Sequence, residues 1–181
     1  MLKKPEHVRH GELVVELEVG CMVNLTEWVP AAEHYQKLDR KISNAYKTIV
    51  PLVAINNTVL LNQSIETQAK ICHNFVDDAE GKYKLTISVS GDFEKFNYIT
   101  DSLTVYPMLR IKGVWIEGLC MHNIWEDCVT CCWRDVDTSE PGTEFMGRPG
   151  SQELYFETPI YRWLLQHDRN PNYYLKEKNH A

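Results

Sequence analysis

The sequence lacks the short motifs that mark the commonest catalytic and nucleotide-binding sites. It contains neither glycine-rich phosphate cradle, G-x-x-x-x-G-K-[ST] or G-x-G-x-x-G, and such loops are what bring backbone N–H groups to a phosphate. An H-E-x-x-H zinc motif and a G-x-S-x-G nucleophile turn are also absent. The seven histidines are scattered along the chain. A non-enzymatic protein is therefore favoured, and an enzyme whose site only the fold assembles stays open.

Long apolar runs are missing as well. No stretch reaches the roughly 18 apolar residues that a membrane-spanning helix needs. The opening residues, MLKKPEHVRHGELVV, carry positive charge but no apolar segment of the kind found in secretory signals. Six cysteines in 181 residues are too sparse for a small disulfide-stapled scaffold. These features predict a cytoplasmic protein with reduced thiols and no membrane partner.

Acidic charge is unevenly distributed. The chain has a net charge of −6, with 44% apolar and 24% charged residues, as in ordinary globular proteins. Residues 119–157 contain two basic and eight acidic residues, so this segment alone carries −6. The excess of acid disfavours binding to a phosphate backbone. It indicates either a solvated loop face or a surface that meets a basic partner.

In the first half, hydrophobic spacing predicts one strand and two helices. Residues 12–19 alternate acidic and apolar side chains, as a strand does. Thr26 can cap a helix that continues to Pro51, with apolar residues three and four apart. Ser64 can cap a second helix ending near Val76. Both helices would pack an apolar face on the core.

The second half has strand-like composition. Residues 83–89, 103–111 and 128–136 are rich in β-branched and aromatic residues. Residues 139–153 contain two prolines and three glycines and read as a loop. Thr158-Pro159 is a typical helix start.

These elements predict an α+β fold in one domain, residues 1–170, followed by a loose tail at 171–181. Helices from the first half would cover an antiparallel sheet from the second half, with the C-terminal helix at one edge.

The stretch CMHNIWEDCVTCCW holds four cysteines and a histidine within residues 120–133. Zinc prefers four thiolate or imidazole ligands in a tetrahedron. A candidate metal site is therefore formed by Cys120, His122, Cys128 and Cys131. Buried thiols packed in a strand are the favoured interpretation, because alternate strand residues face opposite sides and would separate two of these cysteines. Redox or nucleophilic chemistry at the C-x-x-C pair formed by Cys128 and Cys131 is a third alternative. The cofactor prediction is accordingly none, or one structural zinc ion.

The acidic segment also contains aromatic residues of the kind that anchor protein interfaces. The candidate partner-binding residues are Trp125, Glu126, Asp127, Glu144, Phe145, Tyr155 and Phe156. Most of these aromatic side chains are equally suited to a core.

Two segments of the second half follow the patterns L-T-[VI]-S and P-x-[IL]-x-[LI]-x-G-x-W-L-E. The matching residues are Leu85, Thr86, Ile87, Ser88, Pro107, Leu109, Ile111, Gly113, Trp115, Ile116 and Glu117. Together these segments resemble the core of SymE-type toxins, small proteins with an AbrB-like fold. The resemblance covers about 35 residues, and the family's Ala-Gly-Phe turn is replaced by Leu-Cys-Met at 119–121. It implies a swapped-hairpin β fold, dimerisation and action on RNA or DNA.

The function predicted from the sequence is that of a non-enzymatic intracellular binding protein. It would act as an inhibitor, adaptor or immunity-type factor on another macromolecule, most simply a protein with a basic surface. A SymE-like nucleic-acid-acting protein and an enzyme without a linear motif are the alternatives. A homodimer is compatible with each.

Overall fold

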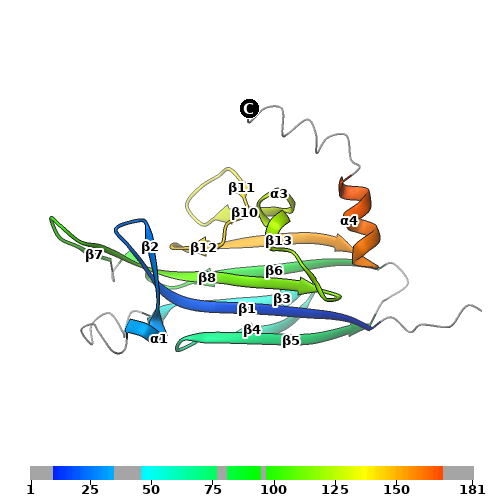
Figure 1. Ribbon diagram of the computed structural model, residues 1–181, viewed down its shortest axis with the longest axis horizontal. Coiled ribbons are helices and arrows are strands. Elements are labelled where there is room, and N and C mark those ends of the chain that lie inside the picture. The colour runs from blue at the N-terminus through cyan, green and yellow to red at the C-terminus, as the bar shows by residue number, and fades with distance from the viewer. Residues whose placement is uncertain (1–9, 35–45, 77–80, 95–96, 169–181) are drawn as a thin grey trace, which may run out of the picture.

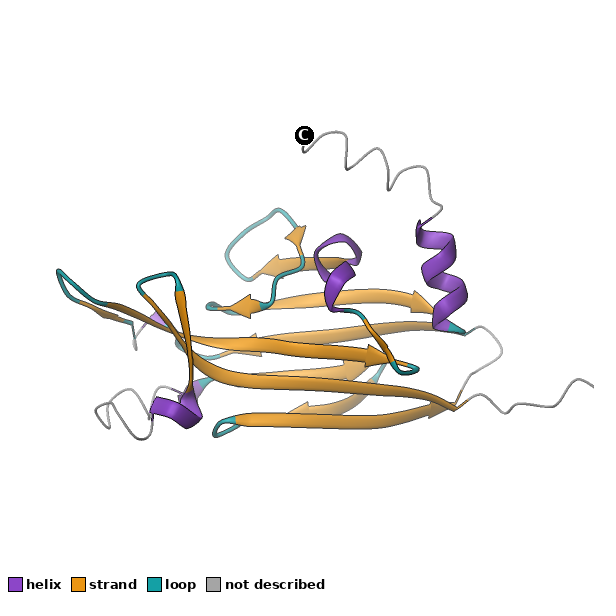
Figure 2. Ribbon diagram, in the orientation of Figure 1, coloured by secondary structure: helices purple, strands orange, loops and turns teal. Residues whose placement is uncertain are grey.

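The computed structural model describes residues 10–34, 46–76, 81–94 and 97–168. Its strands form two antiparallel sheets, and the helices are short (Figure 1). The predicted α+β fold, with helices of the first half covering a sheet, is therefore wrong. Strands from both halves of the chain build both sheets, as the colours of Figure 1 show. Figure 2 shows the two layers of strands in orange and the short helices in purple.

Sheet A has the strand order β12-β8-β1-β2, with three further strands paired at its sides. Strand β1 is its centre, because β5 pairs with one half of it, β2 with the other, and β8 with nearly its whole length. The strands are β1 (His10–Val23), β2 (Glu27–Pro30), β5 (Gln68–Val76), β7 (Tyr98–Ile99), β8 (Thr104–Ile116), β9 (Leu119–Cys120) and β12 (Phe145–Met146).

Sheet B has the strand order β11-β10-β13-β6-β3-β4. Its strands are β3 (Val50–Ile55), β4 (Thr58–Asn62), β6 (Lys82–Ser90), β10 (Val129–Trp133), β11 (Glu140–Pro141) and β13 (Gly150–Glu157). The chain passes repeatedly between the two sheets, so each sheet depends on pairings between residues far apart in the sequence.

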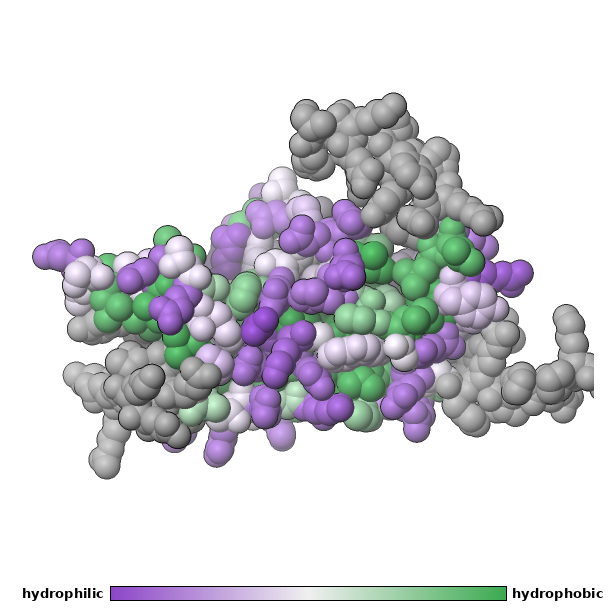
Figure 3. Space-filling view, in the orientation of Figure 1, coloured by the Kyte–Doolittle hydropathy of each residue, from purple (hydrophilic) through white to green (hydrophobic). Residues whose placement is uncertain are grey.

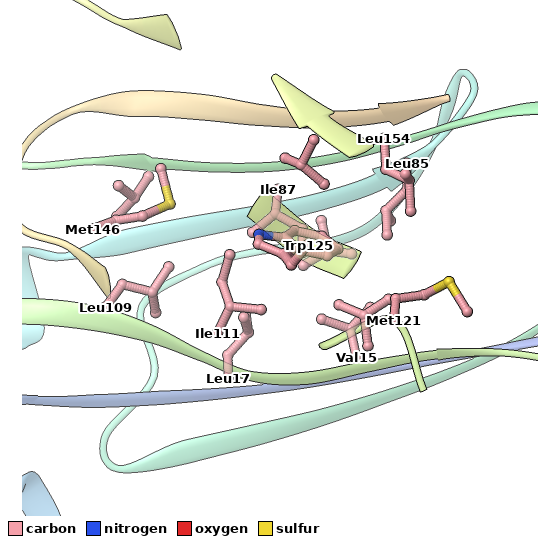
Figure 4. Close-up of a cluster of buried hydrophobic side chains, with 14 of the residues drawn as sticks. Val15, Leu17, Leu85, Ile87, Leu109, Ile111, Met121, Trp125, Met146 and Leu154 are labelled. Carbon is pink, nitrogen blue, oxygen red and sulfur yellow. The ribbon is translucent and has the colours of Figure 1, made fainter. Parts of the chain in front are cut away.

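The core lies between the sheets. In β1, β6 and β8 buried and exposed residues alternate, which puts one side of each strand inward. Figure 4 shows Leu17 and Ile111 of sheet A facing Leu85 and Ile87 of sheet B, with Trp125 between the layers. Leu17, Leu85 and Ile87 are 0% exposed. Burial of such side chains stabilises the fold by about 1.5–3 kcal/mol each.

Several predicted strands are confirmed. The segments 12–19, 83–89, 103–111 and 128–136 overlap β1, β6, β8 and β10. The predicted loop at 139–153 is wrong in part, since β11, β12 and the start of β13 occupy it.

The second predicted helix, from Ser64 to Val76, is wrong. Its apolar residues also fit a strand, because Ile71 and Phe75 alternate with Lys70 and Cys72. Pairing along nine residues of β1 selects the strand. Pro30, taken as the first turn of the other predicted helix, lies in β2 instead.

The helical elements are peripheral. They are α1 (Ala31–His34), η1 (Tyr46–Thr48), η3 (His122–Ile124), α3 (Trp125–Cys128) and α4 (Ile160–Asp168). The predicted helix after Thr158-Pro159 is confirmed as α4, which buries Ile160. The rest of the first predicted helix, at 35–45, and the predicted tail lie outside the described residues. Within the described ranges, no helix has both the length and the apolar character needed to cross a membrane.

Candidate partner-binding site

The predicted zinc ligands do not come together. Cys120 and His122 are exposed on β9 and η3, and Cys128 is half-buried at the end of α3. Cys131 is 0% exposed, because the alternation of β10 turns it into the core. In the part of the chain that the structure describes, no group of three or more His, Cys, Asp or Glu residues could hold a metal ion. The predicted zinc site is therefore wrong.

Burial makes two of these thiols poor acids. Removal from water raises the pKa of the Cys131 thiol to about 11. Burial also raises the pKa of Cys21 to about 11, partly opposed by its hydrogen bond with the Tyr46 hydroxyl. Both thiols stay protonated near neutral pH and behave as packed apolar groups.

Four of the predicted partner-binding residues line one pocket. Trp125, Glu126 and Asp127 of α3 face Glu144, which precedes β12, around a cavity of about 230 Å³. The remaining lining residues are Ile111, Gly113, Val114, His122 and Asn123. We call this cavity the acidic pocket.

The other predicted binding residues lie elsewhere. Phe156 is 2% exposed and stacks on Tyr83 in the core. Tyr155 is 60% exposed on the outer side of sheet B, where its hydroxyl donates to Glu153. Phe145 is half-buried on β12, next to the pocket in sequence. The structure therefore groups the acidic residues with Trp125 and separates them from Tyr155 and Phe156.

The acidic pocket lies on the edge of β8 opposite β1. On this side β12 pairs with Leu109 and Arg110, and β9 pairs with Trp115 and Ile116. Between them, no described strand pairs with residues 111–114, whose backbone partners on this edge are the carbonyl oxygen of Glu144 and the N–H of Met121. The register of β8 on β1 shifts at the same place, which marks a β-bulge. Bulges are frequent beside functional sites because they change the direction of side chains.

A buried amide fixes the two walls of the pocket. Gln152 of β13 is 1% exposed. Its side-chain oxygen accepts from Trp125 Nε1 at 3.0 Å and from the Thr143 backbone N–H at 2.8 Å. Its nitrogen donates to the Thr143 carbonyl oxygen at 2.8 Å. One side chain therefore holds α3 and the segment before Glu144 in register.

The electrostatics of the pocket favour a cation. Glu126, Asp127 and Glu144 contribute three carboxylates, and Arg110, which pairs with Glu144, lies outside the described lining. Glu126 and Asp127 are exposed, whereas Glu144 is half-buried. A partly enclosed cluster of one sign interacts more strongly with an opposite charge than a fully solvated surface does.

An arginine-centred cluster adjoins the pocket on the outer face of sheet A. Arg110 bonds to Glu144 through Nε and lies 3.7 Å from Glu18 Oε2. Its guanidinium carbon is 5.9 Å from the Trp28 ring centroid and 5.6 Å from that of Phe145. Such distances are typical of cation–π contacts. We call this cluster the Arg110 patch. It consists of Trp28, Arg110 and Phe145 together with three half-buried residues at neighbouring strand positions, Met22, Tyr106 and Met108.

The composition of the Arg110 patch matches that of interface cores. Aromatic residues, methionine and arginine are enriched in protein–protein interfaces relative to other surface. Glu18 underneath is only 8% exposed, because Arg110 and the Trp28 indole N–H both contact its carboxylate. Figure 3 shows this side of the molecule with hydrophilic side chains across the middle of β1, β5 and β8.

Sequence reasoning missed Arg110, Gln152 and Trp28. Each lies on a strand with no local sign of a polar role, and only the pairing of β1 with β2 and β8 brings two of them together.

The chain matches no protein-family model, no curated protein and no solved structure. The SymE resemblance, the cytoplasmic location and the homodimer therefore stay predictions.

Proposed function

We propose that this protein is a non-enzymatic binding protein that recognises another protein through the acidic pocket and the Arg110 patch. The partner would place a lysine or arginine side chain in the pocket. Apolar or aromatic side chains next to that residue would contact Trp28, Phe145 and the methionines of the patch.

The observation that carries the proposal is the chemistry of the pocket. Three carboxylates line it, and Arg110, which pairs with Glu144 from the adjoining patch, is not itself among the lining residues. Its volume of about 230 Å³ is below the roughly 300–1,000 Å³ of typical small-molecule sites. A cavity of this size accommodates a single long side chain better than a whole metabolite.

The arrangement also supports specificity. A guanidinium or ammonium group that enters the pocket exchanges water for charge-assisted hydrogen bonds, which are about twice as strong as neutral ones. Glu144 is shared between the pocket and Arg110. Binding at the pocket would therefore be coupled to the position of Arg110 in the adjoining patch.

The proposal is tested by selecting ligands from a random peptide display library on the immobilised full chain. We expect enriched peptides to contain Lys or Arg beside an apolar or aromatic residue. Their affinity should fall at least tenfold in the double variant Glu126→Gln, Glu144→Gln, and should weaken with added salt.

A matched control is Glu66→Gln, which neutralises an exposed carboxylate outside the pocket and the patch. It should leave affinity unchanged. Enrichment of peptides without basic residues, or equal affinity for the pocket variant and the control, would contradict the proposal.

A further inference from the structure

A second cavity lies on the outer face of sheet B, away from the acidic pocket. It is an open groove of about 530 Å³ at the end of the sheet where β13 begins and β6 ends. Five of its lining residues form one row of directly paired positions across five strands. In order from β4 to β10, the row is Asn62, Leu52, Ser88, Ser151 and Cys132.

Small side chains create the groove. Ser88 and Ser151 face each other on the central strands β6 and β13. Leu52, Arg134 and Pro149 also line it. Because side chains of one strand alternate between the faces, this outward row is separate from the buried row that includes Ile87 and Gln152.

Four polar side chains that line the groove, Asn62, Ser88, Ser151 and Arg134, form no hydrogen bond or ion pair with the described residues. The Ser90 hydroxyl makes one long contact, 3.5 Å, with the carbonyl oxygen of Val50. Two hydroxyls, an amide and a guanidinium therefore remain available at the same groove.

The charge of the groove is positive although the protein is acidic. Arg134 is the one charged side chain among the described lining residues. Nearby, the guanidinium carbon of Arg148 lies 4.6 Å from the centroid of the Trp133 ring. The indole N–H of Trp133 donates to the Glu140 carboxylate at 2.7 Å. These two charges oppose each other, which leaves Arg134 as the recognition element for an anion. A guanidinium binds phosphate and carboxylate through paired N–H donors.

We propose that this groove binds a small polyol that carries an oxyanion, such as a sugar phosphate or a sugar acid. The oxyanion pairs with Arg134. The ligand hydroxyls hydrogen-bond to Ser88, Ser151 and Asn62, and the carbon skeleton lies against Leu52. The volume of about 530 Å³ is within the range of small-molecule sites. The site is independent of the proposed protein interface on sheet A.

The experiment is a two-dimensional amide NMR titration of the full chain with glucose 6-phosphate and, separately, with glucuronate. Glucose and inorganic phosphate serve as probes for the two halves of the ligand. We expect saturable shifts confined to the groove-lining residues of β3, β4, β6, β10 and β13 and to the segment around Arg134, with at least one of the two charged sugars. Glucose alone should bind at least tenfold more weakly.

Variants distinguish a specific binding site from non-specific electrostatic attraction of the charged sugars. Arg134→Gln should weaken binding at least tenfold, and Ser151→Ala should weaken it severalfold. Arg162→Gln removes an exposed positive charge on α4, outside the groove, and should have no effect. Two results would overturn the proposal: no saturable shifts with either charged sugar, or equal binding by the Arg134 and Arg162 variants. Preference for one charged sugar would identify the anionic group within the proposed class.

Discussion

Replacing Gln152 with methionine tests whether this buried amide holds the acidic pocket together. Methionine is similar in length but can neither accept nor donate the three hydrogen bonds. The change leaves the Trp125 indole N–H and the Thr143 backbone N–H without their acceptor. It also leaves the Thr143 carbonyl oxygen without its donor. Trp125 is 6% exposed, so water cannot readily replace the lost partner.

The expected loss of stability follows from the three polar groups that lose their hydrogen-bond partner. A buried polar group left unsatisfied costs about 1–3 kcal/mol. Thr143 is half-buried, so water partly compensates there. We expect the free energy of unfolding to fall by about 2–4 kcal/mol. For a chain of this size that corresponds to a drop in Tm of roughly 5–15 °C.

Urea unfolding followed by tryptophan fluorescence measures the effect. Gln68→Met is the matched control, because Gln68 is exposed on β5. It should change stability by less than about 0.5 kcal/mol. Gln152→Glu provides a second test. It retains the acceptors but loses the donor when ionised, so this variant should become more stable as acidic pH protonates it. Equal stability of Gln152→Met and Gln68→Met would refute the reasoning.

Three further predictions follow from other contacts. Arg110→Gln should lower the free energy of unfolding by about 2 kcal/mol, because it leaves the nearly buried Glu18 without its cation. Lys70→Gln breaks the exposed pair with Glu16 and should cost less than about 1 kcal/mol in the same denaturant assay. Gly20→Ala should lower the free energy of unfolding by about 1–3 kcal/mol, since the added Cβ would lie 2.5 Å from the Val29 carbonyl oxygen. Gly147→Ala should be nearly neutral by thermal unfolding, because the atoms nearest to its added Cβ belong to the flexible Met108 side chain. Because burial raises the pKa of Cys131 from 9.0 to about 11, the unfolded chain releases this proton first, and the contribution of Cys131 to stability should fall by up to about 2–3 kcal/mol as pH rises from 9 to 11. Cys21 contributes in the same window, so a Cys131→Ala variant should keep a smaller pH slope, and an unchanged slope would contradict this.

The sequence contained enough information to find the strands with clean alternation. In β1, buried Leu13, Val15 and Leu17 alternate with Glu12 and more exposed residues, and a period of two identifies such a strand locally. The segment at β5 fits periods of two and of about 3.6. Its strand form comes from pairing with β1, which no local pattern contains. The α+β prediction failed largely at that step.

The candidate site was predictable only in part. Glu126, Asp127 and Glu144 stand out as an excess of charge, and the structure places them around one cavity. Glu18 looked like an exposed strand residue, yet Trp28 and Arg110 cover it. Such tertiary contacts depend on strand register and on a bulge in β8, which are properties of the whole fold.

The most direct test of the central proposal is whether the acidic pocket binds an isolated arginine side chain. Nα-acetyl-arginine amide is titrated into the full chain, and the indole N–H signal of Trp125, one of five tryptophans, is followed by NMR. The citrulline analogue has nearly the same shape without the charge. We predict a saturable shift with the arginine compound, with a Kd on the order of 1 mM, and none with citrulline. Equal shifts with both compounds, or no shift with either, would contradict a pocket built to receive a basic side chain.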